Sequence, residues 1–191
     1  MIELLMALSL TGILAVAASL VLFGGKAAFT VPALAAKIRD DIRYTQALAM
    51  SGTKLGVSSA AAPVFRYRMR FNVADANCPG AGQYTIVNDA DYNGAWGENP
   101  NASGVVESGR NPSDGAPYFC VKLNTGNYAG LTASASFGAT VGDARILEFD
   151  NYGVPYNDDG RMLSAGTVTI SGGAQAATVT VAPNTGSVTV Q

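Results

Sequence analysis

The chain opens with a nearly continuous run of apolar residues from Leu4 to Gly25. As an α-helix this run would be about 33 Å long, which matches the hydrocarbon core of a bilayer. A cleaved secretory signal fits less well, because such a signal has a basic start and a shorter apolar segment. The pattern therefore predicts an apolar N-terminal helix over residues 1–25 that serves as a membrane anchor.

A second pattern, with the 3.6-residue period of a helix, follows from Val31 and ends near Gly52. Gly24, Gly25 and Pro32 separate it from the first run, and Thr30 can cap its start. We predict that residues 26–52 form an amphipathic half of the helix that packs on a globular head. Its apolar face is Leu34, Ala35, Ile38, Ile42, Thr45, Leu48 and Ala49, and its charged residues are Lys37, Arg39, Asp40, Asp41 and Arg43.

Beyond Pro63 the hydrophobic period changes from 3.6 to 2. Apolar residues from Phe65 to Phe71 alternate with Arg66, Arg68 and Arg70. We interpret this segment as a strand with one buried face, and we expect the arginines on a solvated or subunit-facing surface.

Further strands are predicted to complete an antiparallel sheet. Residues from about 75 to 140 are rich in Gly, Asn and Pro and are interpreted as variable surface loops. The chain is therefore predicted to be α+β, with a long N-terminal helix packed on a β-rich head over residues 53–191. The remaining predicted strands are Tyr84–Val87, Val105–Glu107, Tyr118–Leu123, Arg145–Asp150, Thr167–Ser171, Thr178–Ala182 and Ser187–Gln191.

Composition and charge narrow the function. The 191 residues carry a net charge of -2 without a basic cluster, which argues against nucleic-acid binding. The chain has no histidine, so it lacks the commonest general base and the commonest transition-metal ligand. No phosphate-binding loop, nucleophile elbow or zinc-protease motif occurs either. These features predict that the chain is not an enzyme and that it requires no cofactor.

Cys78 and Cys120 are the two cysteines of the chain. An even number of cysteines in a head that follows a membrane anchor is typical of export to an oxidising compartment. We predict a disulfide between them. In the chain-entropy model, closing a loop of this length contributes on the order of 4 kcal/mol.

The segment from Asp89 to Gly94 matches the opening of a calcium-binding loop, in which oxygen ligands alternate and a glycine makes the turn. The closing acid of such a loop is missing, because its position is held by Pro100. Two interpretations remain open: a looser calcium site formed by Asp89, Asp91 and Asn93, or an ordinary turn. The similar segment 157–160, Asn-Asp-Asp-Gly, is predicted to be a turn.

Glu3 is the only charged residue among the first 25. A carboxylate at the centre of a bilayer costs about 2.5 to 3.5 kcal/mol on insertion scales, so Glu3 is expected to have a partner. Small residues recur beyond it at a four-residue spacing, which places them on one helix face along which helices can approach closely. This stripe is either an assembly face or the result of common helix composition, and it consists of Ala7, Thr11, Ala15 and Ser19.

The start Met1-Ile2-Glu3-Leu4-Leu5, followed by an Ala-, Leu- and Ile-rich helix, resembles the N-terminus of mature type IV pilins and type II secretion pseudopilins. In that family a peptidase removes a short basic leader. Met1 matches the third residue of the mature family sequence, so the resemblance implies a leader and two mature residues before it.

Four further segments resemble the H-type (FimT-like) pseudopilin group. Together with the anchor they leave the stretch from 75 to 140 unmatched, as an insertion into a compact head. The segments are Asp40–Ala49, Leu147–Pro155, Thr167–Ile170 and Asn184–Val188.

The resemblance implies a structural subunit of a type IV pilus or pseudopilus filament. Its partners would be further copies of the same chain, the pilus or type II secretion assembly machinery, and the bacterial inner membrane before assembly. The carboxylate of Glu3 would be neutralised by the N-terminal amine of a neighbouring subunit, usually N-methylated in the family. The finished filament would be an extracellular pilus or a periplasmic pseudopilus. The alternative is a membrane-anchored envelope binding module that never polymerises.

Overall fold

The computed structural model describes residues 30–51 and 66–191. One α-helix precedes all the strands in this part of the chain. The elements are α2 Val31–Ser51, β1 Tyr67–Phe71, β2 Gln83–Asn88, β3 Phe119–Lys122, the short 3₁₀ helix η1 Gly126–Tyr128, β4 Thr132–Ser136, β5 Ile146–Phe149, β6 Pro155–Asn157, β7 Gly160–Arg161, β8 Gly166–Gly172, β9 Gln175–Val181 and β10 Val188–Val190.

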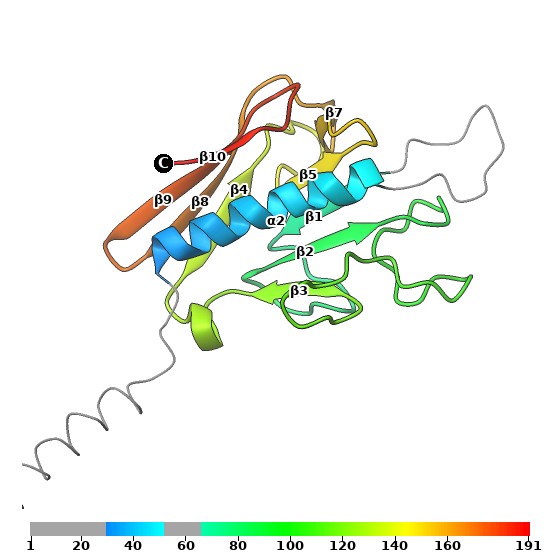
Figure 1. Ribbon diagram of the computed structural model, residues 1–191, viewed down its shortest axis with the longest axis horizontal. Coiled ribbons are helices and arrows are strands. Elements are labelled where there is room, and N and C mark those ends of the chain that lie inside the picture. The colour runs from blue at the N-terminus through cyan, green and yellow to red at the C-terminus, as the bar shows by residue number, and fades with distance from the viewer. Residues whose placement is uncertain (1–29, 52–65) are drawn as a thin grey trace, which may run out of the picture.

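The strands form two antiparallel sheets, and α2 lies across both of them (Figure 1). The larger sheet has six strands in the order β3-β2-β1-β5-β6-β7, and the smaller has four in the order β10-β9-β8-β4. Helix α2 contacts β1 and β5 of the larger sheet and β8, β9 and β10 of the smaller. The predicted α+β class is confirmed, although the predicted single sheet is divided into two.

The residues at the start of α2 explain why the helix begins there. The hydroxyl of Thr30 accepts a hydrogen bond from the N–H of Ala33 at 3.4 Å, which caps the first turn. Pro32 lies within that turn, where N–H groups have no intrahelical acceptor, so its missing N–H costs the helix no hydrogen bond. The apolar face turns inward as predicted, and Leu34, Ile38 and Ile42 have no exposed surface. Burying each such side chain stabilises the fold by about 1.5–3 kcal/mol.

Asp41 lies in this buried face and not on the polar face where the sequence placed it. Only 6% of the residue is exposed. Its carboxylate accepts a 2.6 Å hydrogen bond from the hydroxyl of Tyr84 on β2 and pairs with Lys37 at 2.9 Å. Burial raises the pKa of Asp41, while the contacts with Tyr84 and Lys37 oppose that rise. The helix is therefore joined to the larger sheet by a charge-assisted bond as well as by apolar packing.

Buried and more exposed residues alternate along β8 and β9 of the smaller sheet. Val168, Ile170, Val179 and Val181 are fully buried on one face of β8 and β9. The partner strand β4 was not predicted, because its sequence Thr-Ala-Ser-Ala-Ser has no large apolar residue. It is a strand because it pairs along its whole length with β8.

The prediction that the strand arginines lie on a solvated or subunit-facing surface is wrong for Arg68 and Arg70. Arg68 pairs across the strands with Glu148 of β5, which is 2% exposed, and Arg70 pairs with Asp75. The segment after β2 covers this face of the sheet: the ring of Trp96 lies 4.0 Å from the guanidinium carbon of Arg68. The stretch interpreted as variable surface loop therefore contributes a cover for the back of the sheet.

The strand predicted at Val105–Glu107 is also wrong. The carbonyl of Val105 accepts a hydrogen bond from Asn101 in a turn, so this backbone is not free to extend a ladder. A single bridge between Val87 and Ser108 is all that forms next to it.

The turn predicted at 157–160 is confirmed between β6 and β7, and it also holds a neighbouring loop. The Asp159 carboxylate accepts hydrogen bonds from the backbone N–H groups of Thr140, Val141 and Gly142. These bonds to the charged form lower the pKa of Asp159 from 3.8 to about 2.

Replacing Tyr84 by Phe tests the bond between α2 and the larger sheet. The buried Asp41 carboxylate would lose a donor, so we expect the free energy of unfolding to fall by about 1–3 kcal/mol. Tyr152→Phe, at a side chain in a residue that is 79% exposed, is the matched control and should change it by less than about 0.5 kcal/mol. Denaturant unfolding of the purified chain measures both, and equal effects would contradict the assignment.

Asp159→Asn tests the docking of the 140–142 loop through its pH dependence. Because the folded pKa lies below the unfolded one, the stabilisation is complete above about pH 4 and is lost as the pH falls through about 2. We expect the variant to unfold more easily than the natural chain at pH 6, with a smaller difference at pH 2. Asp114→Asn, which removes a carboxylate with one backbone donor, serves as control in the same melts. A difference that stays constant with pH would be inconsistent with this role.

Candidate functional site

The predicted assembly residues Glu3, Ala7, Thr11, Ala15 and Ser19 lie outside the residues that the structure describes. In residues 30–51 and 66–191, no helix combines the length and the apolar character needed to cross a membrane.

The predicted disulfide between Cys78 and Cys120 is confirmed. It joins the loop after β1 to strand β3, with the two Cα atoms 5.6 Å apart. Gln83 holds the same loop from inside, donating from its amide nitrogen to the carbonyls of Cys78 and Gly80 at 3.0 and 2.6 Å. The disulfide indicates an extracytoplasmic location, because the cytoplasm keeps most thiols reduced.

Three segments that are far apart in the sequence meet at one side chain, Gln46 of α2. Its amide nitrogen donates to the carbonyl of Gly153, in the segment after β5, at 2.8 Å. The same nitrogen donates to the carbonyl of Thr185, in the turn between β9 and β10, at 3.2 Å. Gly186 has a φ of +65°, and a Cβ on it would lie 2.7 Å from the Gln46 nitrogen and 2.8 Å from the ring of Phe149. The helix, the larger sheet and the smaller sheet are thus joined at a point where only glycine fits.

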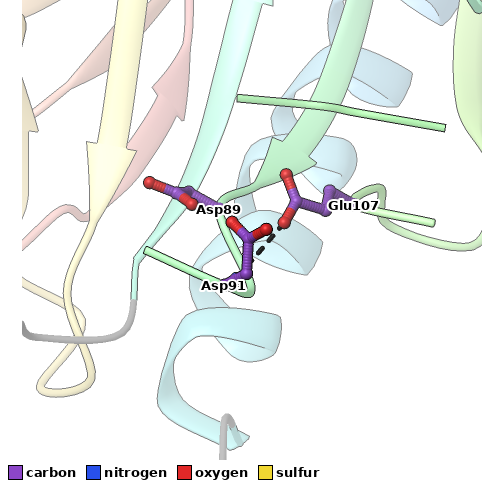
Figure 2. A group of neighbouring side chains, drawn as sticks. All are labelled: Asp89, Asp91 and Glu107. Carbon is purple, nitrogen blue, oxygen red and sulfur yellow. Dashed lines mark hydrogen bonds between the residues drawn. The ribbon is translucent and has the colours of Figure 1, made fainter. Parts of the chain in front are cut away.

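A cluster of three carboxylates lies at the end of β2. Oxygen atoms of Asp89, Asp91 and Glu107 all lie within 4.8 Å of one another. In Figure 2, Asp89 and Asp91 lie on the segment that leaves β2, and Glu107 reaches them from the segment that returns. Sequence spacing selected the two aspartates but not Glu107, which is 16 positions beyond Asp91 and belongs to no local motif.

Glu107 is the buried member of the cluster, with no exposed surface. Its Oε1 accepts hydrogen bonds from the N–H of Ala90 at 2.8 Å and from the side-chain amide of Asn101 at 2.9 Å. Its Oε2 is buried and has no hydrogen-bond partner. Within residues 30–51 and 66–191, no lysine or arginine forms an ion pair with Glu107, Asp89 or Asp91.

The two aspartates lie nearer the surface, and Asn93 forms hydrogen bonds with both of them. The backbone N–H of Asn93 donates to Asp89 at 3.1 Å and to Asp91 at 3.3 Å. The side-chain oxygen of Asn93 accepts from the N–H of Ala95 at 2.6 Å, so Asn93 organises the turn while Glu107 completes the cluster. Burial raises the pKa of Asp89, the N–H groups of Gly94 and Asn93 oppose this, and the carboxylates of Glu107 and Asp91 raise it further.

All three side chains of the cluster offer carboxylate oxygens. Carboxylate oxygens suit calcium, magnesium or manganese, whereas softer metals favour imidazole and thiolate. The chain has no histidine, and its two cysteines are joined in the disulfide.

The architecture is α+β and is consistent with a pilin-like fold: an amphipathic helix packed on antiparallel sheets, with a disulfide in the head. No protein-family model, no curated protein and no solved structure matches the chain.

Gly186→Ala tests the junction at Gln46. An L-residue at positive φ costs roughly 1–2 kcal/mol, and the Cβ would also push against Gln46 and Phe149, so we expect a loss of about 2–4 kcal/mol in the free energy of unfolding. Gly173→Ala is the matched control, because Gly173 also has a positive φ but its Cβ would meet nothing within 4 Å. The control should lose only about 1–2 kcal/mol. Equal losses in denaturant unfolding would mean that the junction is not tightly packed.

Proposed function

We propose that this chain is a structural subunit of a type IV pilus or a related pseudopilus filament. The apolar segment over residues 1–25 would pack in the filament core, and the described head would form the outer shell. The observation that carries the proposal is α2: an amphipathic helix, five residues beyond a membrane-length apolar run, with its apolar face buried across both sheets of a pilin-like head.

The burial of α2 supports this function because it fixes to the head the helix that follows the apolar segment in the sequence. Helix α2 is held by apolar packing, by the hydrogen bond that Asp41 accepts from Tyr84, and by the hydrogen bond that Gln46 donates to Gly153. Its opposite side, which includes Pro32, Ala33, Asp40 and Ala47, is exposed and could face neighbouring subunits.

Glu3 supplies the proposed reason to assemble. A carboxylate in hydrocarbon is costly, and a charge-assisted hydrogen bond to the N-terminal amine of a neighbouring subunit would offset that cost. Assembly would then be coupled to extraction from the membrane, since the same contact is not made by an isolated chain. The small residues Ala7, Thr11, Ala15 and Ser19 would give the close helix approach that this contact needs.

The disulfide supports the location that this function requires. An extracytoplasmic head agrees with insertion in the inner membrane, followed by incorporation into an extracellular pilus or a periplasmic pseudopilus by the assembly machinery. We propose no catalytic role for the chain.

Glu3→Gln tests the proposal in cells. We expect at least a tenfold loss of the chain from sheared surface filaments or from an overproduced pseudopilus, because the neutral amide cannot form an ion pair with the amine. Electron microscopy and quantitative immunoblotting of the sheared and membrane fractions measure this loss. Glu3→Asp, which keeps the charge on a shorter side chain, should recover part of the incorporation.

The state of the head is checked in the same samples. The Cys78–Cys120 disulfide should form equally in the natural chain and in Glu3→Gln, which separates failed assembly from failed folding. If the natural chain stays entirely with the membranes, the membrane-anchored binding module is the better description. Normal filaments from Glu3→Gln would refute the role of the carboxylate.

A further inference from the structure

We propose that Asp89, Asp91 and Glu107 form a calcium site that closes the base of the loop between β2 and β3. Two observations carry this inference independently. The first is the convergence of three carboxylates with no basic partner among the described residues. The second is the buried Oε2 of Glu107, which has no hydrogen-bond donor.

The distances suit one ion. Calcium binds oxygen at about 2.3–2.6 Å, so two ligand oxygens on opposite sides of the same ion are about 5 Å apart. The three carboxylate oxygens lie within 4.8 Å of one another, which is inside that limit. A single calcium ion can therefore contact all three with small side-chain adjustments.

The charge of the site requires compensation. A buried carboxylate is normally paired or bound to a metal, because an isolated charge loses its hydration without replacement. Glu107 is fully buried, and its Oε1 is satisfied by neutral amides while its Oε2 has no partner. A divalent cation would supply the missing partner of Oε2 and would remove the repulsion among the three carboxylates.

Calcium suits this site better than magnesium. Magnesium demands near-ideal octahedral geometry, whereas calcium accepts six to eight oxygens in flexible arrangements. The ligands here come from an irregular loop, and Asp89 and Asp91 are not buried, so water can complete the shell of a bound ion. Extracytoplasmic calcium sites typically have dissociation constants of about 10⁻⁴ to 10⁻³ M, and we expect this range.

Binding would have a structural consequence beyond the site itself. Asp91 and Glu107 flank the segment that contains Trp96, and Trp96 covers Arg68 on the back of the larger sheet. The N–H of Glu107 also donates to the carbonyl of Glu98 at 2.9 Å, within that segment. An ion at the base would fix both ends of the cover, so calcium should stabilise the head as a whole.

Calcium titration of the full chain in detergent tests the inference. After treatment with a chelator, the chain is titrated with calcium chloride by calorimetry. Its thermal unfolding is then measured without calcium and with calcium at about 5–10 times the dissociation constant. We expect one binding event and a rise of several degrees in the melting temperature. Magnesium chloride at the same ionic strength should bind at least tenfold more weakly. Absence of calcium binding at millimolar concentrations, or equal binding of magnesium, would overturn the assignment.

Variants locate the ion. Glu107→Gln retains an acceptor for the amides of Ala90 and Asn101 but loses the charge, and it should lower calcium affinity at least tenfold. Asp91→Asn should do the same at a position that is not buried, so it provides the test if Glu107→Gln fails to fold. Asp114→Asn, in the same loop but outside the cluster, should bind as the natural chain does. Unchanged affinity in Asp91→Asn, or in a folded Glu107→Gln, would rule out this site.

Discussion

The packing of α2 across both sheets is the constraint on which the rest of the head depends. Its stripe of Leu34, Ile38 and Ile42 is buried in a core shared by two sheets that have no ladder hydrogen bonds with each other. Apolar contact of this kind stabilises without fixing direction. The orientation of α2 is fixed by hydrogen bonds at two places along the helix. Asp41 accepts one from Tyr84 of the larger sheet, and Gln46 donates to the carbonyls of Gly153 and Thr185.

Covering one face of the larger sheet with α2 leaves its other face to be covered as well. The loop after β2 covers this face with few large apolar residues, so the contacts there are mainly between charged side chains. Arg68 meets Glu148 beneath the ring of Trp96, and Arg70 meets Asp75. Burial lowers the pKa of Arg70, and Asp75 acts in the opposite sense. Buried pairs of this kind add little net stability, but removing one partner of such a pair is costly.

The irregular stretch on either side of β2, residues 72–82 and 89–118, depends on local attachments because none of its residues belongs to the hydrophobic core. The Cys78–Cys120 disulfide fixes its first part to β3, and the hydrogen bonds accepted by Glu107 fix the segment that carries Trp96. A head displayed outside the cytoplasm gains from such attachments, since a covalent link restricts the unfolded chain and a bound ion would favour the folded one. The junction at Gly186 provides the corresponding attachment for the C-terminal strands.

Periodic patterns in the sequence determined the position of α2, the alternation of β1, β8 and β9, and the α+β class, because burial of one face leaves a regular trace in local sequence. Cysteine number and context were enough for the disulfide. Only the tertiary structure decided the rest. Strand β4 exists through pairing with β8, Asp41 is buried because Tyr84 lies opposite it, and the strand arginines are covered by a loop from elsewhere in the chain. Glu107 joins Asp89 and Asp91 although it is distant from them in the sequence and part of no motif. Such a contact depends on the path of the backbone, which no local sequence pattern reveals.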